Sequence, residues 1–162
     1  MINKGWLVFI LVLGVIGTSL IWYWRYQNKP TKNYDQFASI KEVVVEGVVF
    51  EVELAITPQE RAQGLSGRRD LCNHCGMLFV FNKSGYHSFW MKDTLIPLDI
   101  IWLDENWRVV DYLSFAQPQA TRSIAELPVY KPKEPAQFVL EVPGGTTKKI
   151  KGFDIGRQIE VY

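Results

Sequence analysis

The two cysteines of the chain, Cys72 and Cys75, stand three positions apart, with His74 between them. This spacing is compatible with a redox centre, part of a zinc site or a small disulfide. A redox-active pair normally begins a helix, which lowers a thiol pKa, whereas Gly76 and an apolar, strand-like run follow here. A zinc site needs four ligands and would have to recruit the distant His87. We therefore favour a disulfide that pins a loop, which requires an oxidising compartment.

A second group of chemically capable side chains lies in the segment Tyr86–Asp104. Aromatic and polar residues crowd together here and could form a binding pocket at a strand end. The candidate binding residues are Trp90, Lys92, Asp93, Thr94 and Asp99. The alternative is structural: Asp93 and Thr94 make a turn, and Asp99 caps a neighbouring loop. His87 with these aspartates could serve acid–base chemistry, although no nucleophile completes a triad.

Three arginines, Arg61, Arg68 and Arg69, form the third group. Guanidinium groups hold carboxylates and phosphates well, so Arg61 and Arg68 are further candidate binding residues. No phosphate-binding loop or catalytic motif accompanies them. We therefore prefer internal ion pairs, for example with Glu141 or Asp99.

The N-terminal segment carries a membrane signature. Residues 6–24 contain no charge, and a helix of that length, at about 1.5 Å per residue, approaches the ~30 Å hydrocarbon core. Aromatic residues at both ends are typical of a membrane interface. Large apolar residues follow the small ones, which favours an uncleaved anchor over a cleaved signal peptide. We expect residues 1–5 to be a tail, 6–24 a single transmembrane helix, 25–39 a polar tether and 40–162 one domain, outside the cytoplasm.

Charge is distributed unevenly along the chain. The first 32 residues hold four of the 18 basic side chains and none of the 17 acidic ones, so residues 33–162 have a formal net charge of −3. A mildly acidic body without a basic block argues against nucleic acid as a partner.

The body is predicted to be mainly β. Thr57 to Glu60 combines a capping hydroxyl, an early proline and a reciprocal glutamate, which predicts a short helix over Pro58–Gln63 that ends at Gly64 or Gly67. No alternation of strands and helices indicates a parallel sheet. The expected strands are two within Lys41–Thr57, joined by a turn at Glu46–Gly47, then Met77–Phe81, Ser88–Lys92, Leu98–Leu103, Arg108–Ser114, Gln137–Val142 and Arg157–Tyr162. This pattern is typical of a compact β-sandwich or barrel-like domain with one short helix.

Several motifs occur in an order that resembles the family known as domain of unknown function 192. They are "TPQERAQGLSGRRDL", "GMLFVF", "FWMKDTLIPLDIIWLD" and "VLEVPGG". The resemblance implies a compact β-sandwich-like domain behind an export signal or anchor, and it implies no reaction. The family pattern falls on Glu60, Arg61, Gly64, Leu65, Arg68, Gly76, Met77, Phe79, Phe81, Trp90, Met91, Lys92, Thr94, Pro97, Leu98, Asp99, Leu140, Glu141 and Gly145. This chain departs from it at Asp93, where the family often has Asn, and at the Cys72–Cys75 loop.

These observations favour a membrane-anchored, extracytoplasmic and non-enzymatic domain that binds an unknown small molecule, glycan or protein. Trp90, Lys92, Thr94 and Asp99 would form the site, with Arg61 and Arg68 in support. No metal or cofactor is expected. The alternative is an enzyme, either thiol-active at Cys72 and Cys75 or an acid–base hydrolase at His87, Asp93 and Asp99.

Overall fold

A computed structural model describes residue 34 and residues 36–119 and 126–162 of the chain. These residues belong to one compact unit, Asn33–Tyr162. The predicted anchor, residues 6–24, lies outside them. No helix in the described part of the chain is both long and apolar enough to cross a membrane.

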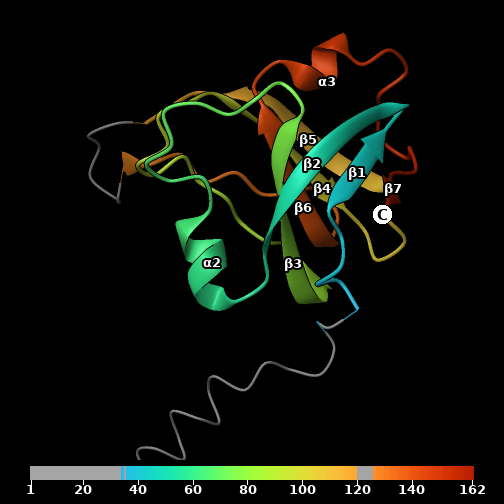
Figure 1. Ribbon diagram of the computed structural model, residues 1–162. Coiled ribbons are helices and arrows are strands. Elements are labelled where there is room, and N and C mark those ends of the chain that lie inside the picture. The colour runs from blue at the N-terminus through green and yellow to red at the C-terminus, as the bar shows by residue number, and fades with distance from the viewer. Residues whose placement is uncertain (1–33, 35, 120–125) are drawn as a thin grey trace, which may run out of the picture. The chain divides into compact units, whose positions relative to one another are not determined.

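The described part is mainly β, as predicted, and its strands form one seven-stranded sheet (Figure 1). The order across the sheet is β5-β4-β6-β3-β2-β1-β7. The strands are β1 (Glu42–Val45), β2 (Val48–Ala55), β3 (Cys75–Gly85), β4 (Leu98–Leu103), β5 (Val109–Ala116), β6 (Ala136–Pro143) and β7 (Glu160–Val161). The prediction of β4 was correct at both ends.

One strand pair contradicts the expected absence of a parallel pairing. β2 and β3 run parallel, with Leu54 opposite Leu78, while the remaining pairs are antiparallel. Parallel neighbours need a crossover connection, and here it contains the helix α2 (Pro58–Gln63) followed by an irregular segment. The parallel pair was not predicted because a helix of six residues does not produce an obvious strand–helix–strand pattern in the sequence.

The helix α2 has the predicted bounds, and local chemistry fixes them. The hydroxyl of Thr57 accepts a hydrogen bond from the Glu60 amide, and the Glu60 carboxylate accepts one from the Thr57 amide. Gly64 ends the helix with a φ of 47°, a conformation that glycine adopts without a steric penalty. A second short helix, α3 (Thr146–Lys149), follows Gly145 and was not predicted.

The sheet curls until its two edges meet. The amide of Ile159, just before β7, donates to the Trp107 carbonyl at 2.9 Å, and the Val109 amide donates to the Arg157 carbonyl at 2.9 Å. The structure is therefore one open, curled sheet, and the sandwich alternative, which requires two packed sheets, is wrong.

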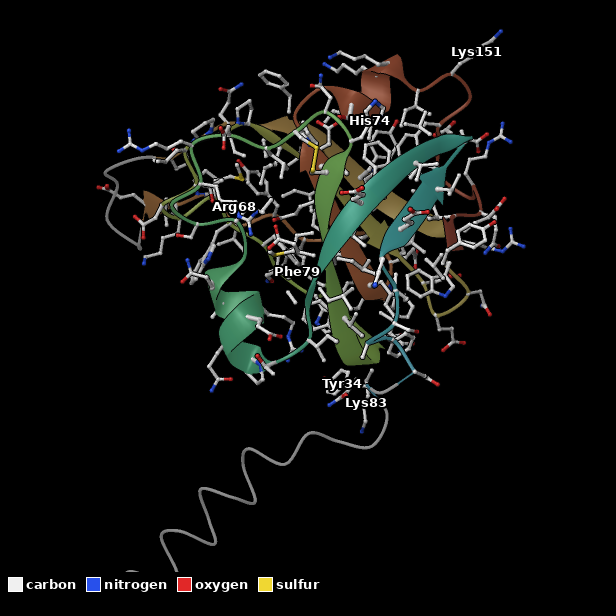
Figure 2. All side chains as sticks on the ribbon, viewed as in Figure 1. Tyr34, Arg68, His74, Phe79, Lys83 and Lys151 are labelled. Atoms are coloured by element: carbon white, nitrogen blue, oxygen red, sulfur yellow. A yellow bond between two sulfur atoms is a disulfide. The ribbon has the colours of Figure 1, made fainter. Side chains whose placement is uncertain are left out.

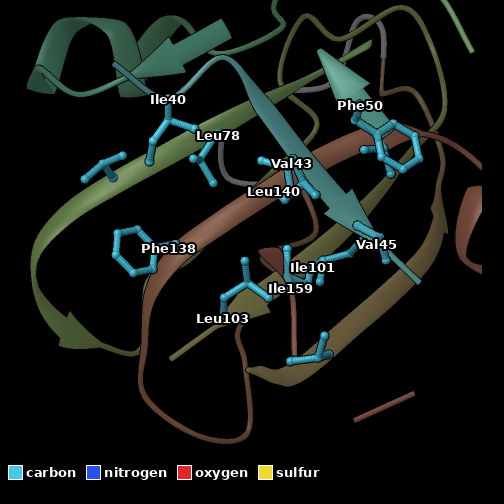
Figure 3. Packing of buried hydrophobic residues seen from close by; sticks show 13 residues of the cluster. Ile40, Val43, Val45, Phe50, Leu78, Ile101, Leu103, Phe138, Leu140 and Ile159 are labelled. Atoms are coloured by element: carbon cyan, nitrogen blue, oxygen red, sulfur yellow. The ribbon is translucent and has the colours of Figure 1, made fainter. Parts of the chain in front are cut away.

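Both faces of the central strands are buried. On β3, Leu78 and Val80 point into the curl, where they meet side chains from β1, β4 and β6 (Figure 3). Met77 and Phe79 point to the opposite, outer face and join a second apolar cluster. Loops following α2 and β3 cover this outer face, and their residues Leu65 and Met91 belong to the same cluster.

The predicted strand Ser88–Lys92 is wrong. This segment belongs to the loop between β3 and β4, and only isolated bridges pair it with other residues. Phe89 pairs with Tyr130, and Lys92 pairs with Gln119. The alternation of side chains was real, but the residues pack as a cover over the outer face and do not join the sheet.

Candidate functional site

A pocket of about 240 Å³ lies on the outer face of the sheet. Its lining comes from α2 and the residues that follow it, from β3 and β6, and from the loop around residues 88–94. The residues that matter most below are Arg61, Phe79, Phe89, Trp90, Lys92 and Glu141. Phe79, labelled in Figure 2, lies between β3 and α2.

Glu141 is the unusual member of this lining. It stands opposite Met77 of β3 and Ile100 of β4, so its side chain shares the outer, apolar face with them. Only 4% of the residue is exposed. Among the described residues, its carboxyl group has no hydrogen-bond or ion-pair partner. Burial raises its pKa from 4.5 to about 8, so the group is mostly protonated at neutral pH.

Aromatic rings line the same pocket as this carboxyl group. The Phe79 and Phe89 rings meet edge to face with their centroids 4.9 Å apart. Two mutual backbone hydrogen bonds of 2.8 Å between Phe89 and Tyr130 fix the loop that carries Phe89. Trp90 is 47% exposed and lines the same pocket. These rings form the apolar part of the lining, and one large ring is open to solvent.

Arg61 lines the pocket, and one nitrogen of its guanidinium group, Nη1, is held by residues outside the lining. Its Nη1 donates to the carbonyl oxygens of Ile56 and, at 2.9 Å, of Val80, and it lies 3.5 Å from the Tyr34 hydroxyl. The guanidinium carbon lies 4.9 Å from the centroid of the Phe81 ring. These contacts tie α2 to the ends of β2 and β3. The expected pairing of an arginine with Glu141 is absent here.

Lys92 and Thr94 also line the pocket, while Asp93 does not. The ammonium of Lys92 forms an ion pair with the Asp93 carboxylate at 3.0 Å. The Thr94 hydroxyl donates to the Lys92 carbonyl at 3.3 Å, and the Asp93 carbonyl accepts from the Gly67 amide at 2.8 Å. Asp93 has a φ of 53°, which Asn and Asp tolerate best. That conformation explains why either residue suits this position.

Asp99 has the structural role that the sequence offered as the alternative. Its buried carboxylate accepts hydrogen bonds of 2.7 Å from the amides of Phe115, Gly145 and Thr147. The Thr147 hydroxyl donates a fourth at 2.6 Å. Asp99 thus joins β4 to β5 and to the start of α3, and it is not part of the pocket lining.

The proposed acid–base group of His87, Asp93 and Asp99 is not assembled. His87 stacks on Phe81, with ring centroids 3.6 Å apart, and its Nε2 lies 3.0 Å from the Lys83 carbonyl. Burial lowers the pKa of His87. Each of the three side chains therefore has its own separate contacts.

Arg68 lies outside the pocket lining and pairs with Glu53. Two hydrogen bonds of 2.5 Å join its guanidinium to both carboxylate oxygens. The hydrogen bond from Arg68 holds the pKa of Glu53 below its ordinary value. An internal ion pair was the preferred expectation, but the expected partners, Glu141 and Asp99, were wrong.

The cysteines form a disulfide, visible as the yellow bond beside the start of β3 in Figure 2. The Cα atoms of Cys72 and Cys75 are 5.1 Å apart, and the Cys75 amide donates to the Cys72 carbonyl at 3.1 Å. The bridge closes a tight turn before β3, in agreement with the favoured interpretation.

Glu141 was not among the candidate site residues. The sequence contains a usable indication, because "QFVLEV" places a single acidic residue inside an otherwise apolar strand. A carboxyl group on a strand that is buried on both faces needs a partner or a proton. The same pattern at Asp99 of β4 gives a structural carboxylate, so the pattern indicates a position to inspect and does not by itself identify a site.

The fold and the lining residues define a member of a family without an assigned activity. The chain belongs to the DUF192 family, described as "Uncharacterized ACR", whose model matches residues 41–161.

Two curated relatives are UPF0127 proteins. UPF0127 protein TK1120 of Thermococcus kodakarensis is 30% identical over 106 residues, covering 62% of this chain and 59% of the relative. A UPF0127 protein of Thermococcus gammatolerans is 33% identical over 104 residues, covering 61% and 59%. The chain therefore matches less than two thirds of the length of either relative.

Two crystal structures share the fold. A protein of unknown function from Novosphingobium aromaticivorans is 34% identical with a TM-score of 0.66, over 75% of this chain and 84% of that one. A Sinorhizobium meliloti protein, named as a candidate transcription regulator, is 30% identical with a TM-score of 0.64, over 75% and 91%.

Proposed function

We propose that this domain is a non-enzymatic binding module that takes a small ligand, or one end of a larger one, into the pocket at Glu141. The observation that carries the proposal is a carboxyl group that is almost fully buried, lacks a partner among the described residues and reaches a pocket. Trp90, Lys92, Thr94 and Arg61 supply the remaining polar and aromatic contacts.

The energetic argument favours a binding role for Glu141 over a structural one. Asp99 is equally buried, yet four hydrogen bonds compensate it, as expected for a structural carboxylate. Glu141 has no such hydrogen bonds, so its burial lowers the stability of the protein at any pH at which the carboxyl group is ionised. Residues of this kind are concentrated at functional sites.

The dimensions of the pocket limit its ligand. A volume of about 240 Å³ lies just below the range of roughly 300–1,000 Å³ in which drug-sized ligands bind. A small metabolite, a single sugar or one protruding side chain of a partner is therefore the appropriate size. Among the described lining residues there is no histidine and no second carboxylate to share acid–base work with Glu141, which favours binding over catalysis.

We further propose that the domain is anchored in the membrane by residues 6–24 and faces an oxidising, extracytoplasmic space. Two observations support this: the uncharged segment with aromatic ends, and the disulfide between Cys72 and Cys75. Fractionation with protease protection of the intact cell tests the location. Digestion of the domain from outside supports it, and protection contradicts it.

Ligand binding is tested by a fragment screen on the purified full chain in a mild detergent, with ligand-observed NMR as the readout. The test variant is Trp90→Ala, and the matched control is Tyr86→Ala, because Tyr86 is a neighbouring, 59% exposed aromatic outside the lining. We expect small polar fragments to bind the wild type and the control, and to lose affinity for Trp90→Ala. Absence of hits, or hits that ignore Trp90, would refute a binding role for this pocket.

A further inference from the structure

We infer that the group received by this pocket is a cation, either a primary ammonium or a guanidinium, which forms an ion pair with Glu141 among the rings of Phe79, Phe89 and Trp90. The inference rests on the proposed function and assigns the chemical class of its ligand.

The first argument is that the pocket lacks a donor for its carboxyl group although cations of the chain are nearby. Arg61 and Lys92 line the same pocket. Carbonyl oxygens of Ile56 and Val80 hold the Arg61 Nη1, and Asp93 holds the Lys92 ammonium. No described residue therefore donates to the Glu141 carboxyl group, and a bound ligand can supply that donor.

The second argument is the nature of the walls. Aromatic faces attract ammonium and guanidinium groups, most strongly where water is excluded. The chain already uses this contact once at this end of the sheet, where the Arg61 guanidinium lies over Phe81. Phe79, Phe89 and the half-exposed Trp90 offer further rings beside Glu141. A pocket lined by a carboxylate and aromatic rings suits a cation better than it suits an anion or an alkyl chain.

The proton balance of this binding step is defined. Glu141 is protonated in the free protein at neutral pH, and it must ionise to pair with a cation, so one proton leaves to solvent for each cation bound. The other charged groups lining the pocket are Arg61 and Lys92, and Asp93 neutralises Lys92. Below pH 8, affinity for a cation therefore rises about tenfold per pH unit.

The experiment compares four probes with the same alkyl chain: n-butylammonium, n-butylguanidinium, n-butanol and butyrate. Isothermal titration calorimetry of the full chain, in buffers of different ionisation enthalpy, measures affinity and proton release together. We expect either cation to bind at neutral pH with release of about one proton, at least about tenfold more tightly than butanol or butyrate. Glu141→Gln removes the proton release and the preference for cations, and the exposed control Glu51→Gln retains both.

The outcomes separate this inference from the proposed function. If butanol or butyrate binds as tightly as the cations and Trp90→Ala weakens that binding, the pocket is a binding site and the cation assignment is wrong. If neither cation binds at millimolar concentration, the assignment is also wrong, and the fragment screen decides the function independently. Cation binding without proton release, or unchanged in Glu141→Gln, places the cation elsewhere and overturns the inference.

Discussion

The substitution Glu141→Gln should stabilise the protein above neutral pH. The folded-state pKa of Glu141 is about 8, against an ordinary value of 4.5. Between these two values the folded protein binds a proton that the unfolded chain has released. Stability therefore decreases as the pH rises from 4.5 to about 8, by about 1.4 kcal/mol per pH unit. Glutamine has nearly the same shape and carries no titrating proton, so the variant lacks this decrease.

The size of the effect follows from the two pKa values. Over the whole interval, the wild type loses roughly 5 kcal/mol of unfolding free energy through this one group. Near pH 5 the variant and the wild type should be similar in stability. At pH 8 and above, the variant should be more stable by several kcal/mol, which is a large fraction of the total for a domain of this size.

The assay is equilibrium unfolding in urea from pH 5.5 to 9. Urea is preferred because guanidinium would itself be a ligand under the inference above. His87 contributes in the opposite sense: burial lowers its pKa, so stability rises as the pH approaches 6.5. The contribution of His87 is common to all variants, so it cancels in the difference in unfolding free energy between variant and wild type. Glu51→Gln serves as the control. If the unfolding free energies of the wild type and Glu141→Gln change with pH by the same amount, Glu141 is not a buried neutral acid.

Three further substitutions test the structural assignments by urea unfolding. Asp99→Asn replaces an acceptor of four hydrogen bonds with a group that also donates, and should lower the free energy of unfolding by about 3 kcal/mol. A loss below about 1 kcal/mol would contradict the structural role of Asp99. Cys72→Ser opens the small disulfide loop and should lower the free energy of unfolding by about 2 kcal/mol. Reduction of the wild type should give the same loss. A reduced protein of unchanged stability would contradict the role of the disulfide in pinning this loop. Gly76→Ala places a Cβ 2.7 Å from the Glu141 carbonyl oxygen, so β3 and β6 must separate. The free energy of unfolding should fall by about 1–3 kcal/mol. An unchanged stability would contradict this close approach of the two strands.

Elements fixed by neighbouring residues could be predicted from the sequence. The capping box at Thr57 and Glu60 defines α2 within a few residues, and the apolar run of β4 defines both of its ends. The parallel pairing of β2 and β3 could not be predicted, because strand alternation is the same in parallel and antiparallel pairs. The segment Ser88–Lys92 alternates like a strand for another reason, since its inward side chains pack on the sheet from outside.

Four of the candidate residues line one pocket, and three of them are close in sequence. Trp90, Lys92 and Thr94 lie in one loop, and they line the pocket together with Arg61. The central carboxyl group was missed because Glu141 reaches the pocket only through the strand order, which places β6 beside β3. Asp99 was misleading for the same reason, since its partners Gly145 and Thr147 lie far along the chain.

The way in which the two sheet edges meet has a consequence for how the protein folds. Residues 157–162 pair with both β1 and the start of β5, and the Tyr162 amide donates to the Glu42 carbonyl at 3.0 Å. The contacts with β1 join positions more than a hundred residues apart, so their loop-closure entropy is among the largest in the fold. Until this segment docks, β1 and β5 both present unpaired edges that can recruit strands from other molecules. Docking of residues 157–162 should therefore be a late step in folding, and it ends the period in which the nascent domain is most prone to aggregate.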